Sequence, residues 1–408
     1  MTILYISQNG VTTHIGGSQV APYLLGLARA GFDIHLLSAE PSGQEQRIAH
    51  YLALFNEAGI RWTHVTYRNK PPILGPVMTQ LRLSQAANRI VARGGVEVVH
   101  CRSHPTAIIG YRLKQRYGVK FIFDFRDFYA DWGLQNTTGV KRMLYQRVKR
   151  LEGPMVQAAD KMICLTRRAC TVLNDAYLGS RTETLANFQV VPCCADFSHF
   201  DPSKVPADTV QSIRAAIGLP DDAFVLLYLG SLGIDYLLEH MVALFRQLLW
   251  LRPNAYFLFV SNNGEAQVQK AFERQGVPIE RIRFTTVPRE TVPAHIALAN
   301  LSVVFIRADH TKVGCSPTKL AELFACNVPV IANPGVGDLD NIIDLVRNGS
   351  VIVRDFSDDA LRQALQNAIG RQEDQMPPVN IRGNSLEFSL EEGVTRYQQV
   401  YQELLKLS

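Results

Sequence analysis

Four consecutive residues, Ser316, Pro317, Thr318 and Lys319, combine a helix-start signal with a cation. Ser316 is a residue type that caps helices, and Pro317 suits the first helical position. The free backbone N–H groups of such a helix carry partial positive charge and Lys319 adds a full one, so the segment predicts a phosphate site. Glu322, one turn later, offers a carboxylate to a ribose diol. The alternative is a capped helix in which Lys319 and Glu322 pair with each other.

A glycine pair, Gly16 and Gly17, follows the first apolar run of the chain. Glycine lets a backbone approach a ligand where any side chain would block it, although such a pair also forms plain turns. The residues from Asn9 to Gly17 lack the G-x-G-x-x-G spacing, which counts against a nicotinamide-dependent enzyme.

Short apolar runs alternate with amphipathic stretches along the whole chain, which indicates parallel sheets covered by helices. We expect a first set of strands at 2–7, 33–38, 61–66, 96–100, 119–124, 161–165 and 189–192. A second set is expected at 224–229, 255–260, 281–284, 301–306, 328–332 and 350–353. The sequence therefore predicts an α/β fold with one domain at 1–200, a second at 201–385 and a closing segment at 386–408.

Two helices have recognisable start signals. The first is expected from Ser18 to Ala30 with Ser18 as its cap, and the last from Ser389 to Leu405 with Ser389 as its cap. Ligands of open α/β sheets bind at the carboxyl ends of the strands, so chemistry is expected in the loops that follow them.

Charge is unevenly distributed along the 408 residues. Residues 1–190 hold 23 Lys and Arg against 12 Asp and Glu, and the remainder holds 19 against 25. The densest basic stretch, Lys141–Arg150, alternates apolar and cationic residues at helical spacing. It is expected either to contact an anionic membrane peripherally or to be a solvated helix face. No nucleic-acid-binding motif accompanies the charge.

Several classes of protein are not supported by the sequence. The longest apolar runs are far shorter than the roughly 20 residues that span a bilayer. The seven cysteines are scattered and form no CxxC pair, which favours reduced thiols in the cytoplasm, and no His or Cys spacing predicts a metal site.

The chain resembles the retaining glycosyltransferases of family 4, the glycosyl transferases group 1, and within them a subgroup with a Ser-Pro-Thr-Lys donor-site motif. The resemblance covers nearly the whole length. It rests on the segments Ser316–Cys326, Val328–Ala332, Gly16-Gly17, Val191–Phe200, Leu229–Leu232 and Phe388–Leu405. It implies the GT-B architecture, in which two Rossmann-like domains face each other across a cleft and a C-terminal helix crosses back to the N-terminal domain.

The resemblance also implies an activity. A hexosyltransferase of this kind moves a sugar from a nucleotide diphosphate sugar, here expected to be a UDP-sugar, to a hydroxyl acceptor, without a metal or a resident cofactor. The implied acceptor is a bacterial envelope glycan or a lipid-linked precursor at the inner face of the cytoplasmic membrane. Two other functions stay open, namely a nucleotide-sugar epimerase or hydrolase of the same fold and a non-catalytic partner subunit.

Carried over residue by residue, the resemblance assigns the donor and catalytic positions. His104 would touch the transferred sugar, Arg126 would reach phosphate and Asp127 an acceptor hydroxyl, while Lys319 would hold the leaving phosphate. A satisfied loop histidine and an Arg–Asp pair bracing a loop are the alternatives. The donor-binding residues would be Gly16, Gly17, Gly264, Thr286, Val287, Ser316, Pro317, Thr318, Lys319 and Glu322.

The chain departs from the family pattern at two positions. Gly314 stands where the family has a first glutamate, and the loop Gly230–Asp235 lacks the usual Arg and Lys. We therefore expect Lys319, Lys312 and Arg126 to neutralise the diphosphate.

Overall fold

The protein is described here by a computed structural model that covers residues 1–373 and 379–406. The chain divides into two compact units, which are described separately. The first unit comprises Met1–Cys193, Thr311–Ser316 and Leu390–Ser408, and the second comprises Cys194–His310 and Pro317–Ser389.

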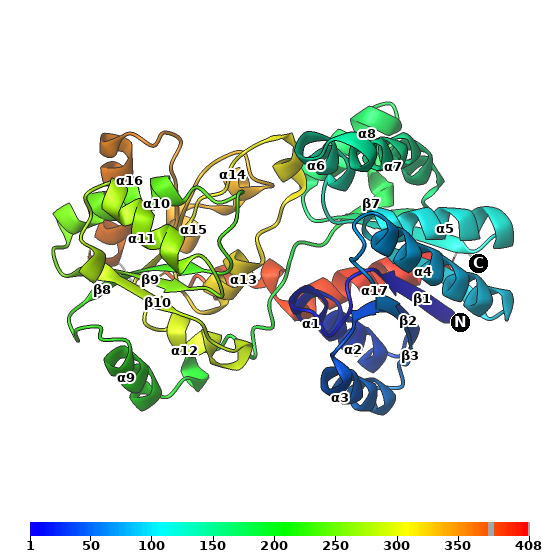
Figure 1. The fold of residues 1–408 in the computed structure, drawn as a ribbon, viewed down its shortest axis with the longest axis horizontal. Coiled ribbons are helices and arrows are strands. Elements are labelled where there is room, and N and C mark those ends of the chain that lie inside the picture. The colour runs from blue at the N-terminus through cyan, green and yellow to red at the C-terminus, as the bar shows by residue number, and fades with distance from the viewer. Residues whose placement is uncertain (374–378, 407–408) are drawn as a thin grey trace. The chain divides into compact units, whose positions relative to one another are not determined.

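The first unit is built on a seven-stranded parallel sheet in the order β3-β2-β1-β4-β5-β6-β7 (Figure 1). Its strands are β1 (Thr2–Ser7), β2 (Asp33–Pro41), β3 (Arg61–Tyr67), β4 (Val96–Arg102), β5 (Lys120–Phe125), β6 (Lys161–Cys164) and β7 (Phe188–Val190). Its α-helices are α1 (His14–Gln19), α2 (Ala21–Arg29), α3 (Glu45–Glu57), α4 (Leu74–Ala92), α5 (Ser103–Tyr117), α6 (Tyr129–Asn136), α7 (Gly139–Ala158), α8 (Arg167–Tyr177) and α17 (Leu390–Lys406).

The second unit repeats this strand order in a six-stranded parallel sheet, β10-β9-β8-β11-β12-β13. The strands are β8 (Phe224–Leu229), β9 (Ala255–Val260), β10 (Ile282–Thr285), β11 (Leu301–Val304), β12 (Val330–Ala332) and β13 (Val351–Ile352). The α-helices are α9 (Ala207–Ala216), α10 (Leu238–Leu251), α11 (Glu265–Arg274), α12 (Val292–Ile296), α13 (Thr318–Ala325), α14 (Leu339–Ile342), α15 (Leu345–Asn348) and α16 (Asp358–Glu373).

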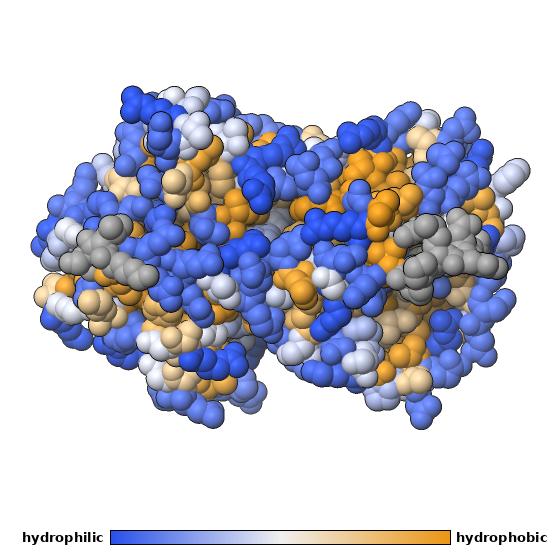
Figure 2. All heavy atoms as spheres, turned by 180° about the vertical axis from the view of Figure 1, so that it is seen from behind, coloured by the Kyte–Doolittle hydropathy of each residue, from blue (hydrophilic) through white to orange (hydrophobic). Residues whose placement is uncertain are grey.

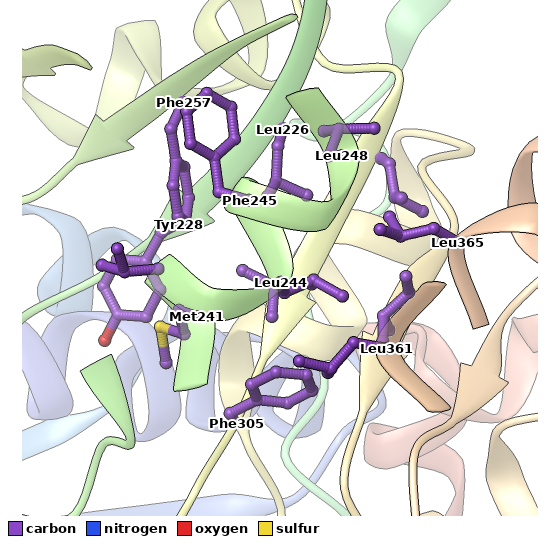
Figure 3. Close-up of a cluster of buried hydrophobic side chains, with 14 of the residues drawn as sticks. Leu226, Tyr228, Met241, Leu244, Phe245, Leu248, Phe257, Phe305, Leu361 and Leu365 are labelled. Atoms are coloured by element: carbon purple, nitrogen blue, oxygen red, sulfur yellow. The ribbon is translucent and has the colours of Figure 1, made fainter. Parts of the chain in front are cut away.

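Helices cover both sheets, and inner strands such as β1 and β8 are buried, largely apolar runs, whereas the edge strands β3 and β10 are less buried. In the second unit, helix α10 places Met241, Leu244, Phe245 and Leu248 against the sheet and against α16 (Figure 3). The face of the molecule seen in Figure 2 is mostly hydrophilic, with hydrophobic residues gathered in a few groups.

All thirteen expected strands are present, and the α/β fold class with two Rossmann-like sheets is confirmed. The expected C-terminal helix is confirmed too, because α17 belongs to the first unit. There, Tyr401 Oη lies 2.8 Å from His100 Nδ1, and Tyr397 Oη donates to Asp124 at 3.2 Å. These hydrogen bonds attach the end of the chain to strands β4 and β5.

The expected cap at Ser18 is wrong. The expected helix is divided into α1, which begins at His14, and α2, whose N-cap is Val20 without a side-chain hydrogen bond. The side chain of Thr13 caps α1 by accepting a hydrogen bond from Gly16 N at 3.1 Å. Ser18 lies inside α1 and donates to His14 O at 2.8 Å. Ser18 is a residue type that often caps helices, but here it lies one turn inside α1, where its hydroxyl bonds to a backbone carbonyl of the same helix.

Gly16 is required by packing within the first unit. A Cβ atom at this position would lie 1.9 Å from Gly10 O, because α1 packs directly on the backbone that follows β1. This close approach is between two parts of the chain itself.

We expect Gly16→Ala to lower the free energy of unfolding by about 2 kcal/mol or more, because the backbone must move to admit the methyl group. Urea denaturation would measure the change. The control is Gly370→Ala in α16, where an added Cβ meets nothing within 4 Å. In that variant the free energy of unfolding should rise by about 0.5–1 kcal/mol, because alanine has a higher helix propensity than glycine. An unchanged Gly16→Ala protein would contradict the packing argument.

Candidate functional site

The segment from Ser316 to Lys319 divides between the two units. Helix α13 begins at Thr318 with Pro317 as its N-cap, and no side chain caps it, so the expected cap at Ser316 is wrong. Ser316 Oγ instead accepts a hydrogen bond from Cys193 N at 3.1 Å in the first unit. The same loop is fixed there by Thr166, whose hydroxyl donates to Val313 O at 2.8 Å.

Lys319 lies between two tyrosine rings of the second unit. Its Nζ is 4.2 Å from the ring centre of Tyr228 on β8 and 4.2 Å from that of Tyr236. Both contacts are cation–π interactions, which strengthen when the ammonium is removed from water, and Lys319 is only 8% exposed. The tyrosines therefore hold the ammonium at one place on the first turn of α13.

The loop after β8 is shaped around this lysine. Gly230 has φ +106°, a conformation that favours glycine, and a Cβ there would lie 3.3 Å from Lys319 Nζ. The hydroxyl of Tyr228 donates to Ser231 O at 2.9 Å and so fixes the same loop. The glycine, the tyrosine and the lysine form one packed group.

Asn263 joins this loop to the one that follows β9. Its side-chain amide donates to Leu232 O at 2.8 Å, and its Oδ1 accepts from Leu232 N at 2.8 Å. Gly264 has φ +91°, and a Cβ there would lie 2.8 Å from Leu232. Thr286, after β10, donates to Ser261 O at 2.7 Å and is followed by the half-buried Val287. The predicted donor residues of the second unit thus share one edge of its sheet.

Glu322 is paired with Arg289 and nearly buried. Arg289 Nη1 lies 3.1 Å from Glu322 Oε1, and the guanidinium lies 5.3 Å from the ring centre of Phe200. Arg289 belongs to the 3₁₀ helix η4 (Arg289–Thr291), in the loop after β10. Nothing in the local sequence marks Arg289 as a partner of Glu322, because only the folded chain brings the two together. A ribose diol at Glu322 would share the carboxylate with this arginine.

Arg126 and Asp124 form a buried ion pair at the end of β5. Arg126 Nη1 lies 3.3 Å from Asp124 Oδ1 and 3.4 Å from Tyr397 Oη. Burial alone would raise the pKa of Asp124, but Arg126 and then His100 outweigh it and hold this pKa well below its usual value. Arg126 is 7% exposed, so in this structure it braces the strand end and α17. The neighbouring Asp127 is exposed to solvent.

His104 is fully buried at the start of α5. Its Nε2 donates to Glu152 Oε2 on α7 at 2.7 Å, and Glu152 Oε1 accepts from Lys149 at 2.8 Å and Tyr177 at 2.6 Å. Burial would raise the pKa of Glu152, but these three donors lower it to about 2. The carboxylate is thus ionised and holds the imidazole in one orientation.

The four residues predicted to be catalytic belong to both units, with Lys319 in the second and the other three in the first. Arg126 and Asp127 are adjacent at the end of β5, and His104 packs against Phe123 and Phe125 of β5 and bonds to α7. Gly17, like Gly16, lies in α1, where a Cβ would meet the Tyr51 hydroxyl at 2.8 Å. Gly314 packs on Phe128, and a Cβ there would lie 3.2 Å from that ring, which leaves little room for a larger side chain.

The pKa of Glu152 predicts how the stability of the first unit depends on pH. This pKa falls from 4.5 to about 2 on folding. The ionised carboxylate therefore makes its full contribution to the stability of the folded state above pH 4.5, and this contribution is lost as the pH drops towards 2. At pH 7 we expect Glu152→Gln to lower the free energy of unfolding by roughly 2–4 kcal/mol. The difference in the free energy of unfolding between this variant and the wild type, measured by urea denaturation, should become smaller between pH 4.5 and 3. The exposed Asp175→Asn is the control, and a gap independent of pH would contradict the assignment.

The contact between Lys319 and Tyr236 is testable by a double-mutant cycle of Lys319→Met and Tyr236→Leu. We expect a coupling free energy of about 1–2 kcal/mol in chemical denaturation, since the ammonium is largely desolvated. Tyr236→Phe keeps the ring and should keep the coupling. Equal effects of the leucine and phenylalanine variants would argue against the ring as the partner.

Comparison with protein families agrees with this division of the chain. Residues 16–171 match the family described as "Glycosyl transferase 4-like domain", and residues 223–371 match "Glycosyl transferases group 1". A search of curated protein sequences finds no significant match.

Solved structures of similar fold extend over the whole chain. A glycosyltransferase from Rickettsia africae matches with a TM-score of 0.71 and 15% identity, covering 100% of this chain and 99% of that one. Sucrose-phosphate synthase from Thermosynechococcus elongatus matches with a TM-score of 0.69 and 17% identity, covering 100% of both chains. The Anabaena protein HepE, crystallised with UDP and glucose, matches with a TM-score of 0.66 and 15% identity over 98% of both chains.

These likenesses identify the fold as GT-B, with the two Rossmann-like sheets described above. Residues 16–171 are thus similar to a glycosyl transferase 4-like domain, and residues 223–371 are similar to a domain of the glycosyl transferases group 1.

Proposed function

We propose that the protein is a retaining glycosyltransferase that moves a sugar from a nucleotide diphosphate sugar to a hydroxyl acceptor. The observation that carries this proposal is the fixed ammonium of Lys319 on the first turn of α13, beside the glycine-containing loop after β8. A cation held next to free helix N–H groups suits a diphosphate. The two matched domains support sugar transfer as the reaction.

The donor is best accommodated along the carboxyl edge of the second sheet. The diphosphate would contact Lys319 and the first turn of α13, and the ribose diol would hydrogen-bond to Glu322. The loops that carry Gly264 and Thr286 would border the base. HepE binds UDP and UDP-glucose, and this supports a UDP-sugar as the donor.

The reaction requires stabilisation of a departing diphosphate. The bond between the sugar C1 and the phosphate oxygen breaks while C1 forms a bond to the acceptor oxygen on the same face. The acceptor proton passes to the departing phosphate oxygen, so no further reactant is needed. Lys319 and the helix N–H groups act by positioning and by stabilising the charge that develops, and neither a metal nor a cofactor takes part in the proposal.

The acceptor is assigned to the first unit, whose sequence is strongly basic. The excess of 23 cations over 12 anions in residues 1–190 suits an anionic acceptor, such as a lipid-linked precursor or an envelope glycan. Asp127, which is exposed at the end of β5, is available to an acceptor hydroxyl.

The test is a thermal-shift and turnover screen against UDP, GDP, dTDP, ADP and CMP and their sugars. We expect one nucleotide family to raise the melting temperature of the wild type, because a ligand that binds only the native state stabilises it. Lys319→Met should abolish this rise in melting temperature. It should also lower turnover at least about a hundredfold, which is the effect expected when a group that stabilises developing charge is removed.

The exposed Lys270→Met on α11 removes a charge elsewhere in the second unit and should behave like the wild type. Consumption of the sugar donor at full rate without an acceptor would indicate an epimerase or hydrolase. No shift with any nucleotide would indicate a non-catalytic partner subunit. Equal losses of fold stability and turnover in Lys319→Met would remove its catalytic role.

A further inference from the structure

Helix α4 is apolar on two of its sides. Its inner side places Thr79, Leu83, Ala87 and Val91 in the core of the first unit. Its outer side exposes four large hydrophobic residues, which are Leu74 (61% exposed), Val77 (39%), Met78 (38%) and Leu81 (56%). A helix that is apolar on its outer side as well is expected where a further partner covers that side.

The four exposed side chains form one stripe. Their spacing of three, one and three residues puts them on one face of an α-helix. The stripe begins at the first residue of α4, and the preceding loop is fixed to the helix by Thr79, whose hydroxyl accepts from Arg68 N at 2.9 Å and donates to Gly75 O at 3.1 Å. The helix lies beside α5 along the sheet (Figure 1).

The charges around this stripe have one sign. Residues 58–96 contain six cations and not a single Asp or Glu. At 100° per residue, Arg82 and Arg89 lie along one border of the stripe, and the exposed Arg68 and Lys70 precede it. An apolar stripe with cations along one border and no anion on the same helix is the pattern of a helix that lies at the surface of an anionic bilayer.

The basic stretch of α7 presents a different surface. Lys149 is bound to Asp131 at 2.7 Å and to Glu152 at 2.8 Å, so its charge is already compensated within the unit. Leu144 and Val148 are half-buried, and Leu151 packs against the core. Two large hydrophobic residues of this helix are exposed, Val140 (58%) and Met143 (57%), against the four of α4, so α7 offers less apolar area to a lipid surface.

The same charges oppose a second copy of the chain as the partner. A two-fold interface places a surface against itself, so Arg82 and Arg89 would meet their own copies without an acidic residue on α4 to compensate them. No helix among residues 1–373 and 379–406 is long and apolar enough to span a bilayer.

We propose that the outer face of α4 is a docking surface for anionic lipid bilayers. The side chains of Leu74, Val77, Met78 and Leu81 enter the boundary between headgroups and acyl chains, while Arg82 and Arg89 contact lipid phosphates. This inference rests on α4 alone and stands whether or not the protein transfers sugars.

Vesicle flotation tests the proposal with phosphatidylcholine vesicles that contain or lack phosphatidylglycerol. We expect the wild type to float with the anionic vesicles and to be released by high salt, which screens the arginines. The pair Leu74→Ser and Leu81→Ser, and separately the pair Arg82→Gln and Arg89→Gln, should each weaken binding roughly tenfold or more.

Two control variants distinguish the outer face of α4 from other surfaces of the first unit. Leu52→Ser removes a single exposed leucine from α3, and Lys141→Gln with Arg142→Gln and Arg147→Gln removes three of the five basic residues of α7. Both should bind vesicles as the wild type does. Loss of flotation only in the α7 variant, or a dimer that Leu74→Ser and Leu81→Ser convert to a monomer without vesicle binding, would overturn the proposal.

A second readout does not depend on loss of function. Leu81→Trp keeps the stripe apolar and places a fluorophore on it. Its emission should shift to shorter wavelength, relative to the wild type, when anionic vesicles are added, because the indole leaves water. An unshifted emission spectrum in the presence of floated protein would show that another surface contacts the lipid and would count against α4.

Discussion

The buried carboxylate of Asp124 joins three parts of the first unit. It lies at the end of β5 and is held by His100 on β4, by Tyr397 on α17 and by Arg126 in the loop directly after β5. An ionised carboxylate removed from water is stable only while such partners remain. The low pKa of Asp124 reflects them, since they outweigh the opposing effect of burial. Strands β4 and β5 and the last helix are thereby fixed together at the edge where the loops begin.

The sequence predicted the fold well because the strand signal is local. Buried parallel strands are apolar runs of several residues, and such runs are visible at Thr2–Ser7 or Phe224–Leu229 without knowledge of any neighbour. The helix caps were harder to predict. Ser18 and Ser316 are suitable capping types, but the hydroxyl of the first bonds inside its helix and that of the second bonds to Cys193. Which partner a hydroxyl takes is decided by tertiary contacts.

The candidate site could be predicted only in part for the same reason. Lys319 and Glu322 are recognisable because they share one short segment with a helix start. Their partners Tyr228, Tyr236 and Arg289 come from distant parts of the chain, and nothing in their local sequence marks them. Glu152, which holds His104, is likewise 48 residues away from it. Site residues that lie within one turn of a helix can be recognised from the sequence. Sites assembled from distant elements cannot.

The charge of the chain explains why these partners matter for the proposed donor. Residues 191–408 hold 19 cations against 25 anions, so the overall field of this part repels a diphosphate. Binding must then come from cations close to the ligand, because exposed charges more than about 10 Å away are screened by salt. A flexible lysine on this background would spend much of its time in water. Two aromatic rings at 4.2 Å help to keep the Lys319 ammonium at the helix start, and a neutral ring does not cancel the charge that an anionic ligand would meet.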